Sequence, residues 1–70
     1  MTHEEAAVIE VIIERWTQRD GTIDYLWSIW RDGKRAAMGE PRRSADAAES
    51  EALESCRRSL HREPDRITRL

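Results

Sequence analysis

Three side chains near the end of the chain, Ser59, His61 and Asp65, have the residue types of a hydrolytic triad. In such a triad a histidine activates a hydroxyl nucleophile, and the carboxylate orients the histidine. The triad also requires a pocket and donors for the oxyanion, whereas these three residues are expected around the end of a helix. The sequence therefore predicts no catalytic residue and no enzyme activity.

Metal chemistry has as little support in the sequence. The single cysteine, Cys56, and the two histidines, His3 and His61, are too far apart in the chain to suggest a ligand cluster. A structural zinc ion needs four ligands close together. No metal ion or cofactor is therefore expected, and Cys56 is interpreted as a small apolar core residue.

The aromatic and basic residues suggest a third kind of chemistry, the binding of single-stranded nucleic acid. Bases stack on aromatic side chains while arginines contact phosphates. The chain has 3 Trp, 1 Tyr and candidate phosphate contacts at six arginines, Arg15, Arg19, Arg31, Arg35, Arg42 and Arg43. Its net charge of −2 opposes such binding. A nucleic-acid-binding module that uses sheet aromatics and an Arg rim is therefore kept as the alternative function.

We expect no membrane-spanning segment and no secretion signal in this sequence. No apolar run approaches the ~20 residues of a membrane helix. The first residues, "MTHEEAAV", lack the basic and apolar regions of a secretion signal. Together with an unpaired cysteine, these features predict a cytoplasmic protein without membrane partners.

Two Arg-Asp-Gly triplets mark the elements that must position any site. They occupy residues 19–21 and 31–33, and each lies between two apolar runs. Asp-Gly suits the two-residue type I′ turn of a β-hairpin. The pattern predicts a three-stranded antiparallel meander with strands near 7–18, 22–31 and 34–40.

The first strand competes with a helix, because residues 2–16 also contain a capping-box pattern and a helical apolar stripe. The β-branched residues between Val8 and Ile13 favour the strand. After the meander, Ser44 or Asp46 can cap a helix near 45–62, and Pro64 ends it. The fold class is thus α+β: one β-β-β-α domain over residues 1–63, followed by a loosely ordered tail at 64–70.

Two-residue turns would place Trp16 opposite Tyr25 and Trp27 opposite Met38, and this register defines two faces. One face consists of Val8, Ile12, Trp16, Ile23, Tyr25, Trp27, Ile29, Ala36 and Met38. The other consists of Ile9, Val11, Ile13, Leu26, Ser28, Trp30, Ala37 and Gly39. The single helix is expected to cover the first face, although the pattern leaves the choice of face open.

A second face rich in large apolar residues would stay exposed in a monomer, which is typical of an interaction site. The predicted interaction face is Ile9, Val11, Ile13, Leu26 and Trp30. We expect a non-enzymatic interaction protein that forms a homodimer, either face to face or edge to edge, with an unidentified protein as the other possible partner.

The segment "YLWSIWRDGKRAAMGEPRRSADAAESEALESC" is similar to many small uncharacterised bacterial proteins of unknown function. Their shared pattern is an aromatic strand, an Arg-Asp-Gly turn, a second strand ending in Gly, and a Ser-started Ala-rich helix. The resemblance implies a β-hairpin–helix architecture and transfers no catalytic or binding residue.

Overall fold

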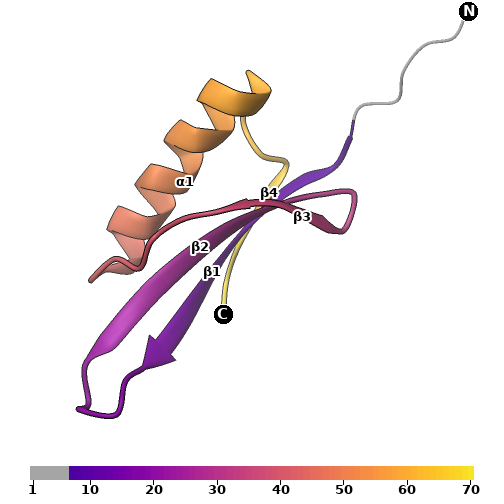
Figure 1. Ribbon diagram of the computed structural model, residues 1–70. Helices are drawn as coiled ribbons and strands as arrows, with labels where there is room; N and C mark the ends of the chain where they lie inside the picture. Colours follow the sequence, from indigo (N-terminus) through magenta and orange to yellow (C-terminus); the bar gives the residue numbers. More distant parts are fainter. Residues whose placement is uncertain (1–6) are drawn as a thin grey trace, which may run out of the picture.

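The computed structural model describes residues 7–70 as an α+β fold with one helix packed on one side of a four-stranded sheet (Figure 1). The elements are β1 (Ile9–Thr17), β2 (Ile23–Arg31), β3 (Lys34–Met38), α1 (Ala45–Leu60) and β4 (Arg66–Arg69). The strand order is β3-β2-β1-β4. Strands β1, β2 and β3 pair antiparallel, whereas β4 is parallel to β1.

The strand interpretation of the first segment is confirmed from Ile9 onward. A helical turn at residues 2–6 would lie outside the described residues. The first hairpin differs from the sequence expectation by one residue. Gln18 N donates to Thr22 O over 2.7 Å, so three residues form the loop, and Gly21 takes a φ of 90°. This is the three-residue hairpin with a left-handed glycine, in place of a type I′ turn.

One extra loop residue reverses the face of every β1 side chain relative to β2, because side chains alternate along a strand. Ile13 lies opposite Trp27 and Val11 opposite Ile29, whereas Ile12 lies opposite Ser28. The predicted pairing of Trp16 with Tyr25 is therefore wrong, since Trp16 lies opposite Asp24.

The second hairpin has the predicted two-residue turn, with φ values of 51° at Asp32 and 82° at Gly33. A register shift then follows in β3, where Ala37 rather than Ala36 lies opposite Ile29. The shift moves Met38 opposite Ser28, away from Trp27. Such a bulge again exchanges the faces of the residues that follow it.

Helix α1 begins at the predicted cap, since Ser44 Oγ accepts a hydrogen bond from Ala47 N over 3.0 Å. Its small residues face the sheet and allow close packing of helix on sheet. The fully buried core contains Ile9, Val11, Ile13, Trp27, Ile29, Ala48, Ala52 and Cys56. Burial raises the pKa of the Cys56 thiol, which stays protonated as an apolar core group.

Trp27 is the largest side chain of this core, and it packs on Gly39. A Cβ atom at Gly39 would lie 2.1 Å from two atoms of the indole, so only glycine fits there. The indole Nε1 donates to Glu51 of α1 over 2.8 Å, and Arg42 forms an ion pair with the same carboxylate. The hydrogen bonds from Arg42, and then from Trp27, hold the pKa of Glu51 below its usual range.

The last residues form a fourth strand, so the expectations of a three-stranded sheet and of a loosely ordered tail at 64–70 are wrong. Strand β4 pairs with β1, and Leu70 N extends the pairing by donating to Ile13 O. Arg69 also forms ion pairs with Asp46 and Glu49 of α1. The exposed edge of β1 supplies backbone partners that composition alone does not show.

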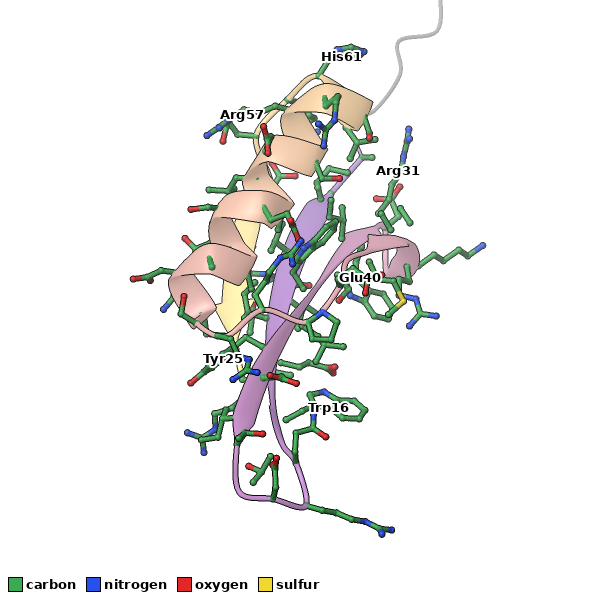
Figure 2. All side chains as sticks on the ribbon, turned by 60° about the vertical axis from the view of Figure 1, so that its left-hand side comes forward. Trp16, Tyr25, Arg31, Glu40, Arg57 and His61 are labelled. Atoms are coloured by element: carbon green, nitrogen blue, oxygen red, sulfur yellow. The ribbon has the colours of Figure 1, made fainter. Side chains whose placement is uncertain are left out.

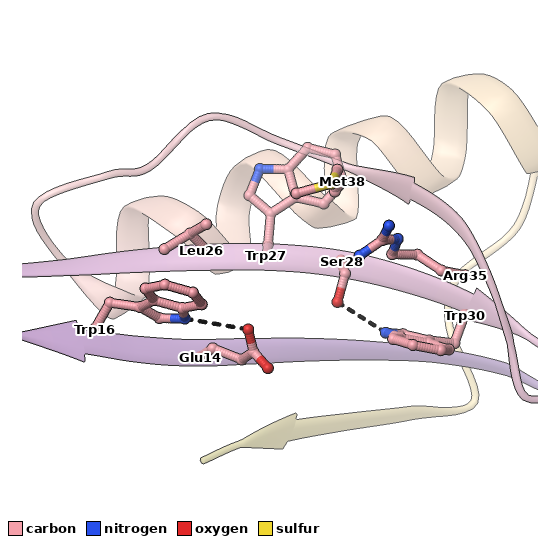
Figure 3. Close-up of a pocket in the computed structure, with 8 residues that line it drawn as sticks. All are labelled: Glu14, Trp16, Leu26, Trp27, Ser28, Trp30, Arg35 and Met38. Atoms are coloured by element: carbon pink, nitrogen blue, oxygen red, sulfur yellow. Dashed lines mark hydrogen bonds between the residues drawn. The ribbon is translucent and has the colours of Figure 1, made fainter.

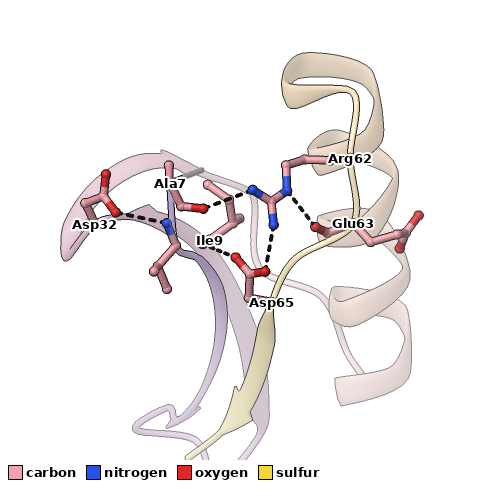
Figure 4. A network of polar contacts seen from close by, with 7 residues as sticks. Ala7, Ile9, Asp32, Arg62, Glu63 and Asp65 are labelled. Carbon is pink, nitrogen blue, oxygen red and sulfur yellow. Dashed lines mark hydrogen bonds and ion pairs between the residues drawn. The ribbon is translucent and has the colours of Figure 1, made fainter. Parts of the chain in front are cut away.

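Asp65 fastens the start of β4 to β1 (Figure 4). Its carboxylate accepts from Ile9 N over 2.7 Å and from Arg62 over 2.7 Å, while Arg62 also donates to Ala7 O. The hydrogen bond from Ile9, together with the positive charge of Arg62, lowers the pKa of Asp65 from its ordinary value of 3.8.

Because of this network, the pairing of β4 with β1 should become less stable as the pH falls. A carboxyl group whose folded pKa lies below its unfolded value stabilises the fold above the unfolded pKa, and its contribution disappears as pH falls through the folded pKa. We expect the amide protection of Asp65 and Leu70 against hydrogen exchange to fall below about pH 4. Asp65→Asn, which has one acceptor oxygen where two are used, should show the low protection already at neutral pH.

Unchanged protection of both amides in Asp65→Asn would contradict the role of the carboxylate. Asp46→Asn is the matched control, because Asp46 is an exposed carboxylate that contacts the Arg69 side chain and, within residues 7–70, accepts no hydrogen bond from a backbone N–H. Protection of Asp65 should be the same in this control as in the unchanged chain.

Candidate interaction surface

The side of the sheet turned away from α1 is here called the open face. It consists of Ile12, Glu14, Trp16, Leu26, Ser28, Trp30, Arg35 and Met38. Figure 2 shows Trp16 on this side of the hairpin. Of the described core, Trp27 alone reaches the groove on this side, and α1 packs on the other side of the sheet (Figure 1).

A groove of about 240 Å³ lies on the open face, lined mainly by large side chains of β1, β2 and β3. The indoles of Trp16 and Trp30 flank it, and Leu26 lies beside Trp16 (Figure 3). Met38 lies along the β3 side and is 52% exposed, as Trp16 is 53% exposed. Exposed apolar residues gathered in this way are typical of an interaction surface.

Hydrogen bonds within the groove hold each indole flat along its own strand. Trp30 Nε1 donates to Ser28 Oγ over 2.8 Å, and Trp16 Nε1 donates to Glu14 over 3.2 Å. In both cases the partner is two residues away on the same strand, and therefore on the same face. The rings consequently present apolar surface to whatever approaches the groove.

Charged groups of both signs surround these apolar side chains. At one border Glu10 forms an ion pair with Arg66, and at another Asp24 lies 3.7 Å from Arg43. Glu14 and Arg35 line the groove itself, and within residues 7–70 neither of them forms an ion pair. The face is therefore mixed in charge and has no continuous basic strip.

The structure separates the five residues predicted as the interaction face. Leu26 and Trp30 are on the open face, half-buried. Ile9, Val11 and Ile13 are at most 1% exposed beneath α1, so their placement on an uncovered face is wrong. The reason is the three-residue loop of the first hairpin, which turns these three side chains toward the helix.

Other residues of the open face also differ from the sequence expectation. The two-residue turns put Ile12, Trp16 and Met38 under the helix, and the two register changes move all three to the open face. The alternation of residues along β1 itself indicates which face is exposed, because Glu10 and Glu14 lie on the same face as Ile12 and Trp16. Acidic side chains are typical of the less buried face of an antiparallel strand.

Within residues 7–70, the residues considered for catalysis and metal binding do not form a site, and His3 lies outside the described residues. His61 is the exposed left-handed residue after α1, with a φ of 59°, and Asp65 binds Ile9 and Arg62. No hydrogen bond joins Ser59, His61 and Asp65 in the described chain. Among residues 7–70 no group of three or more His, Cys, Asp or Glu is arranged to hold a metal ion.

Comparison of the chain with protein-family models, with curated proteins and with solved structures gives no match in any of the three. Within residues 7–70, no helix combines the length and apolar character needed to cross a bilayer. The open face brings together two of the exposed large apolar side chains of residues 7–70, Trp16 and Met38.

Proposed function

We propose that the chain is a small non-enzymatic interaction module that associates with a second copy of itself through the open face. The observation that carries this proposal is the groove, in which two indoles, Leu26 and Met38 stand on the side of the sheet that α1 leaves bare. Burying these side chains removes apolar surface from water, which is the main driving force of association.

The size of the chain supports a partner. Within residues 7–70 the core has eight buried residues, and three of them are the small residues Ala48, Ala52 and Cys56. A domain of this length buries a modest share of its surface and is commonly stabilised by disulfides, metals or association. With one cysteine in the chain, association is the route that the open face offers.

The charges of the face favour a second copy over nucleic acid. Glu14 stands in the groove, and Glu10 and Asp24 lie at its borders. Carboxylates at these positions repel phosphates, whereas a surface with both signs can be complementary to itself. The two exposed indoles are the observation in favour of a nucleic-acid-binding module, the alternative function.

Charge introduced into the groove should weaken the association strongly. We expect Leu26→Lys and Trp30→Lys to stay folded, because each new ammonium faces a carboxylate across the strands, Glu14 or Glu10. Loss of one large apolar contact per copy should raise the dimer dissociation constant about a hundredfold. Light scattering and sedimentation over a concentration series measure this change.

Ala47→Lys is the control, since Ala47 is exposed on α1 and the substitution adds the same charge away from the open face. It should leave the dissociation constant unchanged. A folded chain that stays monomeric from micromolar to millimolar concentration would overturn the proposal. If that monomer binds single-stranded oligonucleotides and Trp30→Lys weakens the binding, the nucleic-acid alternative holds instead.

A further inference from the structure

We infer that the two copies meet in one defined register, in which Glu14 of each copy pairs with Arg35 of the other. The inference rests on the proposed association through the open face and adds which residues meet there. It follows from the position of two charged side chains inside a groove whose other lining residues are apolar except for Ser28.

Glu14 and Arg35 are the groove-lining charges that the fold itself leaves without an opposite charge. Within residues 7–70, Glu14 accepts a hydrogen bond from the Trp16 indole, and Arg35 enters no ion pair. The neighbouring charges Glu10 and Asp24 each have an arginine partner in the same copy. Covering the groove with an apolar surface would bury both Glu14 and Arg35 unpaired, which costs free energy.

The strand registers place these two groups symmetrically about Ser28. Glu14 of β1 lies opposite Leu26, and Arg35 of β3 lies opposite Trp30. They are thus separated by four residues along β2, about 13 Å, and by two strand spacings across the sheet, about 10 Å. The midpoint between them falls on β2 at Ser28.

A two-fold axis that lies in the interface, passes over Ser28 and is perpendicular to the line from Glu14 to Arg35 exchanges the two positions. Each Glu14 then stands over Arg35 of the other copy, and the contact occurs twice, as an isologous interface requires. The charges that are unpaired in one copy become paired in two.

The same rotation matches the apolar residues. It brings Trp30 over Ile12 of the second copy and Leu26 over Met38 of the second copy, given the pairing of Ile12 and Met38 with Ser28. The strands of the two sheets then cross at a steep angle, close to the orthogonal class of sheet packing. Apolar groups thus meet apolar groups in the register in which the charges meet.

Reversing one charge at a time tests the pairing. Glu14→Arg alone would set two arginines against each other, and Arg35→Glu alone would set two glutamates against each other. Because like charges at an interface are strongly repulsive, each variant alone should associate at least about a hundredfold more weakly. A mixture of the two variants restores both Arg–Glu pairs, so equal amounts should form a heterodimer with an affinity near that of the unchanged chain.

Native mass spectrometry of the mixture, with one variant isotopically labelled, measures the heterodimer, and circular dichroism verifies that each variant is folded. The control is Glu54→Arg mixed with Arg58→Glu, which makes the same charge changes at exposed positions of α1. This pair should show no preference for the mixed dimer. Glu14→Lys with Arg35→Asp repeats the test with other side chains if a first variant unfolds.

The possible results distinguish a failure of the Glu14–Arg35 pairing from a failure of the self-association. A monomeric unchanged chain overturns the self-association and the pairing together. A dimeric unchanged chain whose reversed variants show no preference for each other overturns the pairing and leaves the self-association standing.

Discussion

Replacing Gly39 by alanine should destabilise the fold by about 3 kcal/mol, at the upper end of the usual cost of overpacking a core. The added Cβ would lie 2.1 Å from Trp27 Cε2 and Nε1, so the indole has to move. That indole is 6% exposed, and its Nε1 is bonded to Glu51. Any shift therefore opens the packing beneath α1 and lengthens this hydrogen bond.

Denaturant unfolding measures the loss, and the cause is tested with a double-mutant cycle. In a Trp27→Leu background the side chain that blocks the Cβ is absent, so the further cost of Gly39→Ala should become small. An equal loss of unfolding free energy in both backgrounds would show that the clash with Trp27 does not cause the destabilisation by Gly39→Ala.

Gly33→Ala is the control for backbone strain. Gly33 has a φ of 82° and nothing within 4 Å of an added Cβ, so its expected cost of about 1–2 kcal/mol comes from the left-handed conformation alone. That cost should not change in the Trp27→Leu background.

The parts of the fold that the sequence predicts well are those set by local interactions. The Asp32-Gly33 turn, the Ser44 cap and the alternation within β2 each depend on a few neighbouring residues. For the same reason the pattern places Leu26 and Trp30 together on one face of β2, the face opposite to that of Trp27 and Ile29. They are two of the eight residues of the open face, and their common face follows from β2 alone.

The sequence does not predict the length of the first hairpin loop or the pairing of β4 with β1. The triplets at 19–21 and 31–33 have identical residues, yet the first closes a three-residue loop and the second a two-residue turn. Strand β4 has four residues with one apolar side chain, Ile67, and its position follows from the exposed edge of β1 and from Asp65. Neither feature has a distinctive local composition.

Ile13→Ala should lower the free energy of unfolding by about 2–5 kcal/mol, whereas Ile12→Ala should lower it much less. This comparison tests which face of β1 is buried beneath α1. Both substitutions replace isoleucine by alanine at adjacent positions of the same strand, so the change in strand propensity is the same in each. Ile13 is 1% exposed beneath α1, while Ile12 is half-buried on the open face. The pairing expected from a two-residue first turn reverses this order.

Denaturant unfolding of both variants at low protein concentration measures the two costs without a contribution from association. Because a chain of this size has a total stability of roughly 5 kcal/mol, Ile13→Ala is expected to retain at most about 3 kcal/mol and to unfold at a much lower denaturant concentration than the unchanged chain. Ile12→Ala should remain folded and weaken self-association, since Ile12 faces Trp30 of the second copy in the inferred dimer. A larger loss of stability in Ile12→Ala would place α1 on the other face and would remove the open face from which the function was argued.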